Sequence, residues 1–491
     1  MSEPKKLKLR TVVTTDGEID DMDSFIRFLL YSNDVDVAGI ILTSSMFHYR
    51  GTVDKPAYRW TGDTWIPEFI AKYGQVYQNL IKHDPTYPSP ESLLSVYRIG
   101  NVDDVSDMIE ETEGSNFLAD LILDDDDRPL YIQIWGGTNT TARALKSIQE
   151  RYEETTDWDR IKKKVEEKVV LYIILDQDGT YGDYISKHWN IKTLNDSLNF
   201  GYFAYGWKGL PEVFQSSLNA DWHLTHLKNK GQLLDQYALI GDGYYLEGEI
   251  ESEQFGQQEW LSQHPDYETY DFISEGDSPS YFYLLQTSLR GFENPSFGGW
   301  GGRFKETSPN TFTTNQTIDY NPYTKRFEQE YNFYRWIPDI QADLAARAQW
   351  CITDDFKAAT HYPQVKVANK DIQAEPGQVI TLQAKASDPN GHSLKYHWWC
   401  YHEASSYWDF SKIELESDVF RLGDKEHVSS WHSKEMAIDW ALPLTGENTS
   451  VVQFTVPEDA KTGQIMHMIL EVSNVTDLPL KTYERVVVTV K

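Results

Sequence analysis

The chain has 491 residues, which is too many for one ordinary hydrophobic core, so we expect two or more domains. Its 40% hydrophobic and 25% charged residues are typical of a soluble globular protein, and its longest apolar run, Val169–Leu175, is too short to span a bilayer. The formal charge of −31 argues against a nucleic-acid partner, because phosphate binding requires a basic surface.

The N-terminus and the cysteines bear on the cellular location. The first residues, MSEPKKLKLR, are basic but precede no apolar stretch, so no signal peptide is visible. Either the protein is intracellular or the chain is a mature form without its leader; we expect secretion or a periplasmic location, with the cytoplasm as the open alternative. Cys351 and Cys400 exclude a disulfide framework and a Cys-type zinc site, and their spacing leaves their pairing open.

From Thr11 onward, short β-branched or apolar runs alternate with helical patterns. The run at 35–45 is near-continuously apolar, which is typical of a strand in a parallel sheet that is buried on both faces. This alternation predicts an α/β domain with a mostly parallel sheet flanked by helices. The expected elements are a strand at 11–15, a helix at 20–32, strands within 35–45, 128–137 and 167–179, and a strand, tight turn and helix at 269–285.

Two segments rich in aromatic residues, Pro and Gly, 44–101 and 291–323, interrupt this pattern. Such segments are usually functional lids or surface excursions. From about His361 the chain changes to alternating strands and polar turns, which predicts an all-β sandwich of immunoglobulin-like type. The predicted domains are therefore an α/β domain over 1–358 and a β-sandwich over 359–491.

Carboxylates and other polar residues follow each predicted parallel strand. In open α/β sheets the ligand lies outside the carboxyl ends of the strands, so these side chains are expected to converge. No Lys or Arg lies in these loops, and oxygen-only ligation suits Ca²⁺, whereas the lack of a His/Cys cluster argues against zinc. The polar residues are Asp16, Asp20 and Asp21, then Thr43–Ser45, then Gly136, Gly137 and Asn139, then Asp176–Asp178, and finally Glu275 and Asp277.

Helix capping is the alternative explanation for the first group of acids. Asp20 is then an N-cap residue, and Asp21 and Asp23 complement the helix dipole in the first turn. Capping does not account for Asp16, which ends the strand before the helix begins.

The segment TTDGEIDD, Thr14 to Asp21, resembles the D-T-D-x-G-x-D-D signature of nucleoside hydrolases. The resemblance implies that Asp16 is a metal ligand and general base, that Asp20 binds sugar hydroxyls and that Asp21 binds calcium. The first Asp of the signature is Thr14 here, and its Gly is Glu18.

Two further segments resemble the same family. GGTNTTA, Gly136 to Ala142, is similar to a turn whose backbone carbonyl coordinates calcium, which implies Asn139. GDSP, from Gly276, is similar to the segment that closes the metal site, which implies Asp277; the family's leaving-group His is Gly276 here. The closer resemblance is to a divergent nucleoside-hydrolase-like family of bacterial cellulose-binding-associated proteins, formerly a domain of unknown function, on the segments WGGTNT, EGDSPS and WGGRF and the β-sandwich that follows.

These resemblances imply a calcium-dependent glycosyl hydrolase that acts on a furanosyl sugar, either an O-glycoside or a nucleoside. Ca²⁺ held by Asp16, Asp21, Asn139 and Asp277 would bind a water and two hydroxyls, and Asp16 would accept the water's proton. The other expected substrate-binding residues are Asp20, Asp178, Glu275, Asp277, His48, Trp300 and Arg303.

Two other function classes remain open in the sequence. One is a non-catalytic, metal-assisted binding protein for cellulose or another plant glycan, since aromatic residues make up 14% of the chain and sugar faces stack on such rings. The other is a structural calcium ion that only joins the strand ends. The leaving-group acid is unassigned, with Glu275, Asp178 and His48 as candidates, and the expected partners include neither nucleic acid nor membrane.

Overall fold

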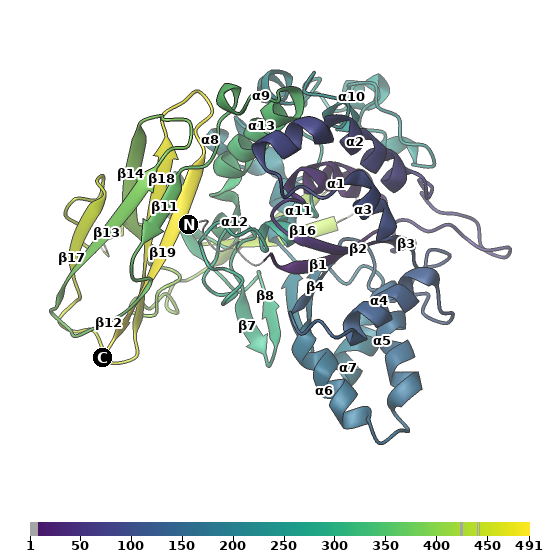
Figure 1. The fold of residues 1–491 in the computed structure, drawn as a ribbon, viewed down its shortest axis with the longest axis horizontal. Coiled ribbons are helices and arrows are strands. Elements are labelled where there is room, and N and C mark those ends of the chain that lie inside the picture. The colour runs from purple at the N-terminus through teal and green to yellow at the C-terminus, as the bar shows by residue number, and fades with distance from the viewer. Residues whose placement is uncertain (1–7, 423–425, 439, 441) are drawn as a thin grey trace.

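An eight-stranded sheet organises the first two thirds of the chain. The structure is a computed structural model that describes residues 8–422, 426–438, 440 and 442–491 (Figure 1). Strand β7 runs antiparallel to its neighbour β8, and the other paired strands of this sheet are parallel. Across the sheet the strands are β3 (Tyr97–Ile99), β2 (Asp36–Leu42), β1 (Arg10–Thr15), β4 (Leu130–Ile134), β5 (Val169–Ile174), β6 (Lys192–Asp196), β8 (Thr311–Thr313) and β7 (Lys305–Ser308).

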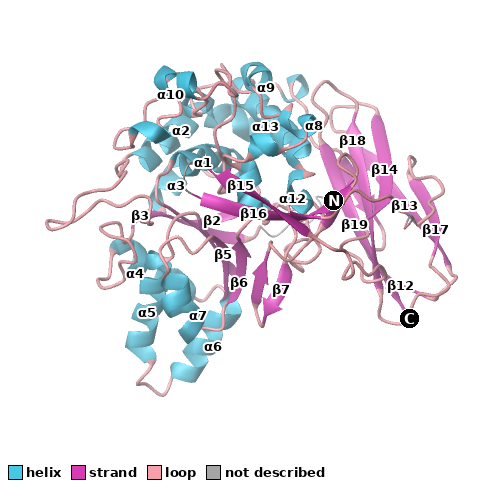
Figure 2. Cartoon of the chain, turned by 180° about the vertical axis from the view of Figure 1, so that it is seen from behind, coloured by secondary structure: helices cyan, strands magenta, loops and turns pink. Residues whose placement is uncertain are grey.

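Helices cover both faces of this sheet. Figures 1 and 2 show α4 to α7 on one face and α1, α2, α9 and α13 on the other. The helices are α1 (Ile19–Tyr31), α2 (Trp65–His83), α3 (Pro90–Ser95), α4 (Glu113–Leu123), α5 (Asn139–Tyr152), α6 (Trp158–Lys168), α7 (Ser186–His188), α8 (Glu212–Gln215), α9 (Ala220–His226), α10 (Gln258–Gln263), α11 (Ser278–Phe282), α12 (Tyr331–Tyr334) and α13 (Ile337–Ile352).

Strand β1 shows why both faces are covered. All six residues of RTVVTT are buried, and successive side chains point to opposite faces of a strand. Val12 therefore packs in the apolar core under α4 to α6, and Val13 packs in the core under α1 and α2. The predicted mostly parallel α/β sheet is thus confirmed.

The predicted strand within 269–285 is wrong. Residues 271–275 are buried but belong to no strand, and helix α11 begins at Ser278. Their backbone N–H groups donate outside the sheet instead, from Phe272 to the Leu218 carbonyl and from Glu275 to the Phe203 carbonyl. The place beside β5 is taken by β6, which the sequence analysis did not predict.

The C-terminal part contains two sheets that face each other around a separate apolar core, with Trp398 and Met468 at its centre. One sheet has the order β11–β13–β17 and the other β12–β19–β18–β14. Their strands are β11 (Gln364–Val367), β12 (Asp371–Ala374), β13 (Val379–Ser387), β14 (Leu394–Cys400), β17 (Val451–Thr455), β18 (Ile465–Asn474) and β19 (Lys481–Val490). The predicted C-terminal all-β part is therefore observed.

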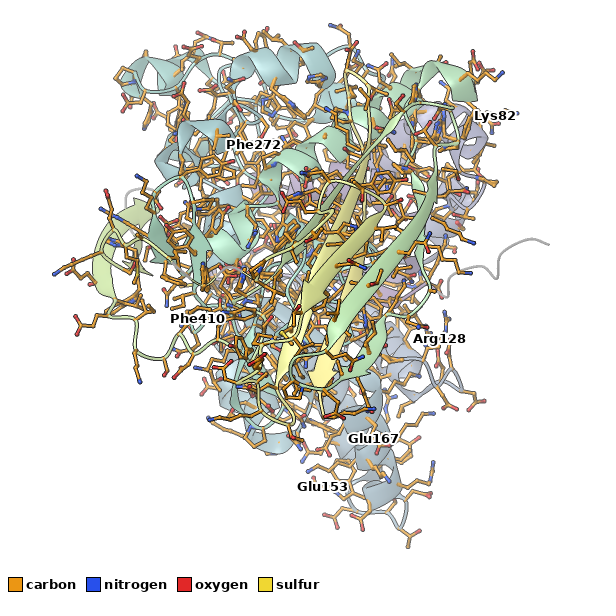
Figure 3. All side chains as sticks on the ribbon, turned by 90° about the vertical axis from the view of Figure 1, so that its left-hand side faces the viewer. Lys82, Arg128, Glu153, Glu167, Phe272 and Phe410 are labelled. Atoms are coloured by element: carbon orange, nitrogen blue, oxygen red, sulfur yellow. The ribbon has the colours of Figure 1, made fainter. Side chains whose placement is uncertain are left out.

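A hairpin from the C-terminal part crosses the predicted domain boundary. Strands β15 (Glu416–Leu422) and β16 (Glu426–His432) extend the small sheet of β9 (Asp319–Asn321) and β10 (Arg326–Glu328). In Figure 3 this hairpin projects on the same side as the labelled Phe410. The two parts therefore share a sheet as well as side-chain contacts.

Both cysteines are buried free thiols, which answers the question that their spacing left open. No helix among the described residues is long and apolar enough to cross a bilayer.

Candidate metal and active site

Four of the predicted acids meet at the point where the strand order of the sheet reverses. From β1 the chain continues to β2 and β3 on one side, while β4, β5 and β6 lie on the other side. Loops that leave the carboxyl ends of adjacent strands in opposite directions open a crevice between them, where such folds bind ligands. Asp16 directly follows β1, and Gly136 lies in the loop after β4.

Four aspartates lie together in this crevice: Asp16, Asp20, Asp21 and Asp277, which we call the acid cluster. One carboxylate oxygen from each of Asp20, Asp21 and Asp277 lies within 4.8 Å of the others. Asp16 adjoins them, since its backbone N–H donates to Asp21 Oδ1 at 3.1 Å. The Thr15 hydroxyl donates to the same oxygen, so the end of β1 and the first turn of α1 are fixed to each other.

Glycines make room for the acid cluster. A Cβ on Gly136 would lie 2.8 Å from the Asp16 Cβ, and a Cβ on Gly276 would lie 2.7 Å from Asp20 Oδ2. Position 276 therefore accepts no side chain while Asp20 keeps its place. Gly17, between the first two acids, has a φ of +84°, which favours glycine.

The acid cluster is buried without counter-charges. Asp16, Asp21 and Asp277 are only 1–2% exposed. Both oxygens of Asp16 and Oδ2 of Asp277 have no hydrogen-bond donor, and no Lys, Arg or His pairs with the cluster in the described part of the chain. Burial, followed by the neighbouring carboxylates, raises the pKa of Asp20, Asp21 and Asp277 well above the ordinary value.

This environment fits a divalent cation. Burying several carboxylates without a partner is costly, and a hard cation with oxygen ligands offsets that cost. The unpartnered oxygens of Asp16 and Asp277, together with Asp20 and Asp21, form a donor set of the kind that Ca²⁺ prefers.

The metal-free protein is expected to lose stability as the pH rises. The folded state holds protons on Asp20, Asp21 and Asp277 more tightly than the unfolded chain, whose aspartates titrate near about 3.9. Their contribution to the stability of the folded protein is complete below that value, and it is lost as the pH rises through the raised pKa values. Bound calcium should reverse this loss of stability with rising pH. At a calcium concentration of about 100 times its Kd, the ion should add about 2.7 kcal/mol to the free energy of unfolding. Thermal unfolding in EGTA or CaCl₂, from about pH 5 to about pH 8, measures both effects; a calcium effect independent of pH would contradict the site.

A second polar group borders the acid cluster and includes His48, which the sequence analysis named as a substrate-binding residue. The His48 ring is fully buried; its Nε2 lies 3.0 Å from Glu249 Oε2, and its Nδ1 lies 3.9 Å from Glu18 Oε2. Arg59 contacts Glu249 at 2.6 Å and Glu18 at 3.1 Å. Burial alone would lower the pKa of His48, but the hydrogen bond to Glu249 and the charge of Glu18 outweigh it and raise that pKa.

These contacts join two loops beside the acid cluster. Arg59 and Glu249 come from two loops, 44–64 and 244–257, that meet over Glu18. The Thr61 hydroxyl, from the first loop, also donates to the Gly17 carbonyl at 2.8 Å. The first loop lies within the segment 44–101, for which the sequence predicts a functional lid or a surface excursion, and neither Arg59 nor Glu249 is among the expected site residues.

Asn139 and Asp178 lie beside the crevice but have other partners. The Asn139 side chain bonds Thr43 and Ser44, and its backbone N–H donates to Asp178 Oδ2 at 2.8 Å. Asp178 also accepts from Thr180, so it holds the loops after β4 and β5 together. Because α5 begins at Asn139, its carbonyl points along the helix axis. We therefore leave Asn139 out of the ligand set and Asp178 out of the sugar contacts.

Glu275 was expected to bind a sugar hydroxyl, and the structure contradicts this. Its oxygens accept from Arg27 Nε at 2.5 Å and Arg27 Nη2 at 2.7 Å, and both side chains of the pair are 0% exposed. Tyr237 and Ser278 donate to the same carboxylate. Glu275 is thus the buried counter-ion of Arg27.

Trp300 and Arg303 were expected to close over a sugar, and this is also wrong. The Trp300 ring is buried and meets Tyr483 of the C-terminal sheet edge-on, with centroids 6.4 Å apart. Arg303 pairs with Asp319 at 2.6 Å. The segment FGGWGGRF thus lies at the contact between the two parts of the chain, where Arg485 also donates to the Gly298 carbonyl at 3.0 Å.

Comparisons with known proteins show the family and the fold of this chain. Residues 10–304 match the family described as cellulose-binding Sde182, nucleoside hydrolase-like domain, and residues 379–490 match the C-terminal domain of cellulose-binding protein Sde0182. A nucleoside hydrolase-related hypothetical protein from Saccharophagus degradans, described as associated with carbohydrate metabolism, has a similar structure. It is 22% identical, with a TM-score of 0.69 over 99% of this chain and 100% of its own.

Other similarities are weaker. The effector protein XOO4466 is 10% identical, and the type III effector XopQ, solved with adenosine diphosphate ribose, is 9% identical. Each covers 71% of this chain and 95% or 96% of its own, with a TM-score of 0.36, which is too low to support an argument. No curated protein matches the chain. Since the first family model spans more than half of its residues, the chain belongs to the nucleoside hydrolase-like family of the cellulose-binding Sde182 protein.

Proposed function

We propose that this protein is a calcium-dependent glycosyl hydrolase that releases a furanosyl sugar from an O-glycoside or a nucleoside. The buried acid cluster, with unpartnered oxygens on Asp16 and Asp277, is the observation that supports this most directly. The names of the matching family and of the Saccharophagus protein add support for a carbohydrate as the partner. A glycan substrate also suits a secreted or periplasmic protein.

Each residue of the acid cluster has a role in this proposal. Asp16, Asp21 and Asp277 would hold the calcium ion, which would acidify a bound water and fix two vicinal hydroxyls. Asp16 accepts the proton of the attacking water as the general base. Asp20 and Asp277 orient the sugar diol, and such positioning lowers the barrier by several kcal/mol.

The residue before Asp277 favours an O-glycoside at least as much as a nucleoside. Gly276 stands where the resemblance places a leaving-group His, and a side chain there would meet Asp20 unless Asp20 moved. A leaving group that depends on that His is therefore not favoured by this chain.

A panel of nucleosides, 4-nitrophenyl furanosides and plant oligosaccharides tests the proposal. We expect calcium-dependent release of free sugar from at least one furanoside and its loss in EGTA. An Asp183→Asn variant, altered at an exposed acid in the segment after β5, should behave like the wild type. Binding of a glycan without release in either condition would overturn the hydrolase proposal and favour the alternative function, a metal-assisted carbohydrate-binding protein.

A further inference from the structure

The proposed function leaves the proton for the departing sugar oxygen without a source. Cleavage of an unactivated O-glycoside normally requires an acid beside that oxygen. The acid cluster is committed to the ion, the water and the diol, Glu275 is paired with Arg27, and position 276 has no side chain. A donor has to come from the wall of the crevice.

The fold holds His48 rigidly in that wall. It follows β2 in a tight turn, in which the His48 carbonyl accepts from the Ser45 N–H at 2.9 Å. The same turn is joined to the loops after β4 and β5, because Gly137 N–H donates to Ser44 and Met46 N–H donates to Gln177. The His48 ring is therefore fixed relative to the strand ends that carry the acid cluster.

Glu249 sets the orientation of the His48 ring. It contacts Nε2 at 3.0 Å and is itself clamped by Arg59 Nε at 2.6 Å and Nη2 at 3.0 Å. Nδ1 is buried, has no hydrogen-bond partner among the residues that the structure describes, and lies on the side of Glu18. Nε2 is thus held by Glu249, whereas Nδ1 faces Glu18, two residues from Asp16, and makes no hydrogen bond to the described residues.

We propose that His48, oriented by Glu249, is the general acid that protonates the leaving oxygen; this inference rests on the proposed function. The Nδ1 proton passes to the glycosidic oxygen as the bond from that oxygen to the anomeric carbon breaks. Water forms the new bond to the anomeric carbon, and its proton passes to Asp16. Substrate and one water thus give the free sugar, a hemiacetal, and the alcohol or phenol of the leaving group, and Asp16 and His48 recover their protonation states by exchange with solvent.

The charges around the ring are compatible with this role. The groups that face it are Glu249, Glu18 and Asp16, which favour the protonated ring, and Arg59, which opposes it. Glu253, from the same loop as Glu249, is the competing donor, because burial raises its pKa to about 7. A test has to separate these two candidates.

Paired substrates distinguish a general acid from a structural residue. Methyl and 4-nitrophenyl furanosides of ribose and arabinose share the sugar, but only the methyl compounds need a proton for departure. We expect His48→Gln to lose roughly 10²–10⁴-fold in kcat on the methyl compound and only a few-fold on the 4-nitrophenyl compound. Glu253→Gln should change both alike. Equal losses of His48→Gln on both substrates, or the selective loss in Glu253→Gln instead, would overturn the assignment.

Glu249→Gln tests the positioning role. Without its partner carboxylate the pKa of His48 falls, so the alkaline limb of the kcat profile on the methyl compound should move to lower pH while KM stays similar. His188→Gln, at an exposed histidine on α7, is the control and should leave the profile unchanged. An unshifted pH profile of kcat in Glu249→Gln would overturn the proposal that Glu249 orients His48. A wild-type protein inactive on both substrates would instead overturn the proposed hydrolase itself, and the inference with it.

Discussion

Replacing Asp16 with Asn is expected to lower kcat by roughly 10²–10⁴-fold while the protein stays folded. Asp16 is the first group after β1, and it is 1% exposed. In the described part of the chain neither of its oxygens has a hydrogen-bond donor, so the carboxylate is available for the attacking water. Asparagine keeps the shape and the backbone bond from residue 16 to Asp21 but cannot accept a proton. The loss should therefore appear in the chemical step.

The measurement is the initial rate on the best furanoside of the panel, at saturating calcium, with the unfolding temperature recorded in parallel. Asp183→Asn serves as the matched control, since it makes the same chemical change at an exposed acid. If Asp16→Asn retained a rate close to that of the wild type, Asp16 would not be the base. If it lost calcium-induced stabilisation completely, its main role would be as an ion ligand.

The acid cluster was largely predictable because its parts carry local signals. TTDGEIDD ends a strand that its β-branched composition predicts, and the convergence of parallel strand ends then places Asp16, Asp20 and Asp21 together. Asp277 was assigned to the same site from GDSP, although the strand predicted before it does not exist. The buried segment before it, anchored by Glu275 to Phe203, delivers Asp277 to the same edge.

The partners of the other charges were not predictable, because they depend on contacts between distant segments. Arg59 meets Glu249 across 190 positions of the chain, and Arg27 meets Glu275 across 248. No local pattern distinguishes an acid that has such a partner from one that has none. The glycine-rich FGGWGGRF was similarly ambiguous, and only the packing against Tyr483 shows that it joins the two parts of the chain.

Glu275 and Asp277, two positions apart, should respond in opposite ways to loss of their charge. Glu275→Gln should destabilise the protein by about 3–5 kcal/mol, because Arg27 is then left as a buried charge without its counter-ion. Asp277→Asn should leave the metal-free protein as stable as the wild type or more stable, because it removes repulsion within the acid cluster. With calcium the order changes, since Asp277→Asn should lose most of the stabilisation that the ion gives to the wild type.

Urea unfolding of the three proteins at neutral pH, in EGTA and in CaCl₂, measures these differences. Glu275→Gln should have a lower free energy of unfolding than the wild type, by a similar amount in both conditions. The reason is that the Arg27 pair lies outside the acid cluster and does not depend on the ion. Equal destabilisation of both variants in EGTA would mean that Asp277 has a protein partner and that the cluster needs no cation. A calcium response in Asp277→Asn equal to that of the wild type would place the ion elsewhere. Because the two residues share one short segment, the comparison separates the effect of charge from that of local packing.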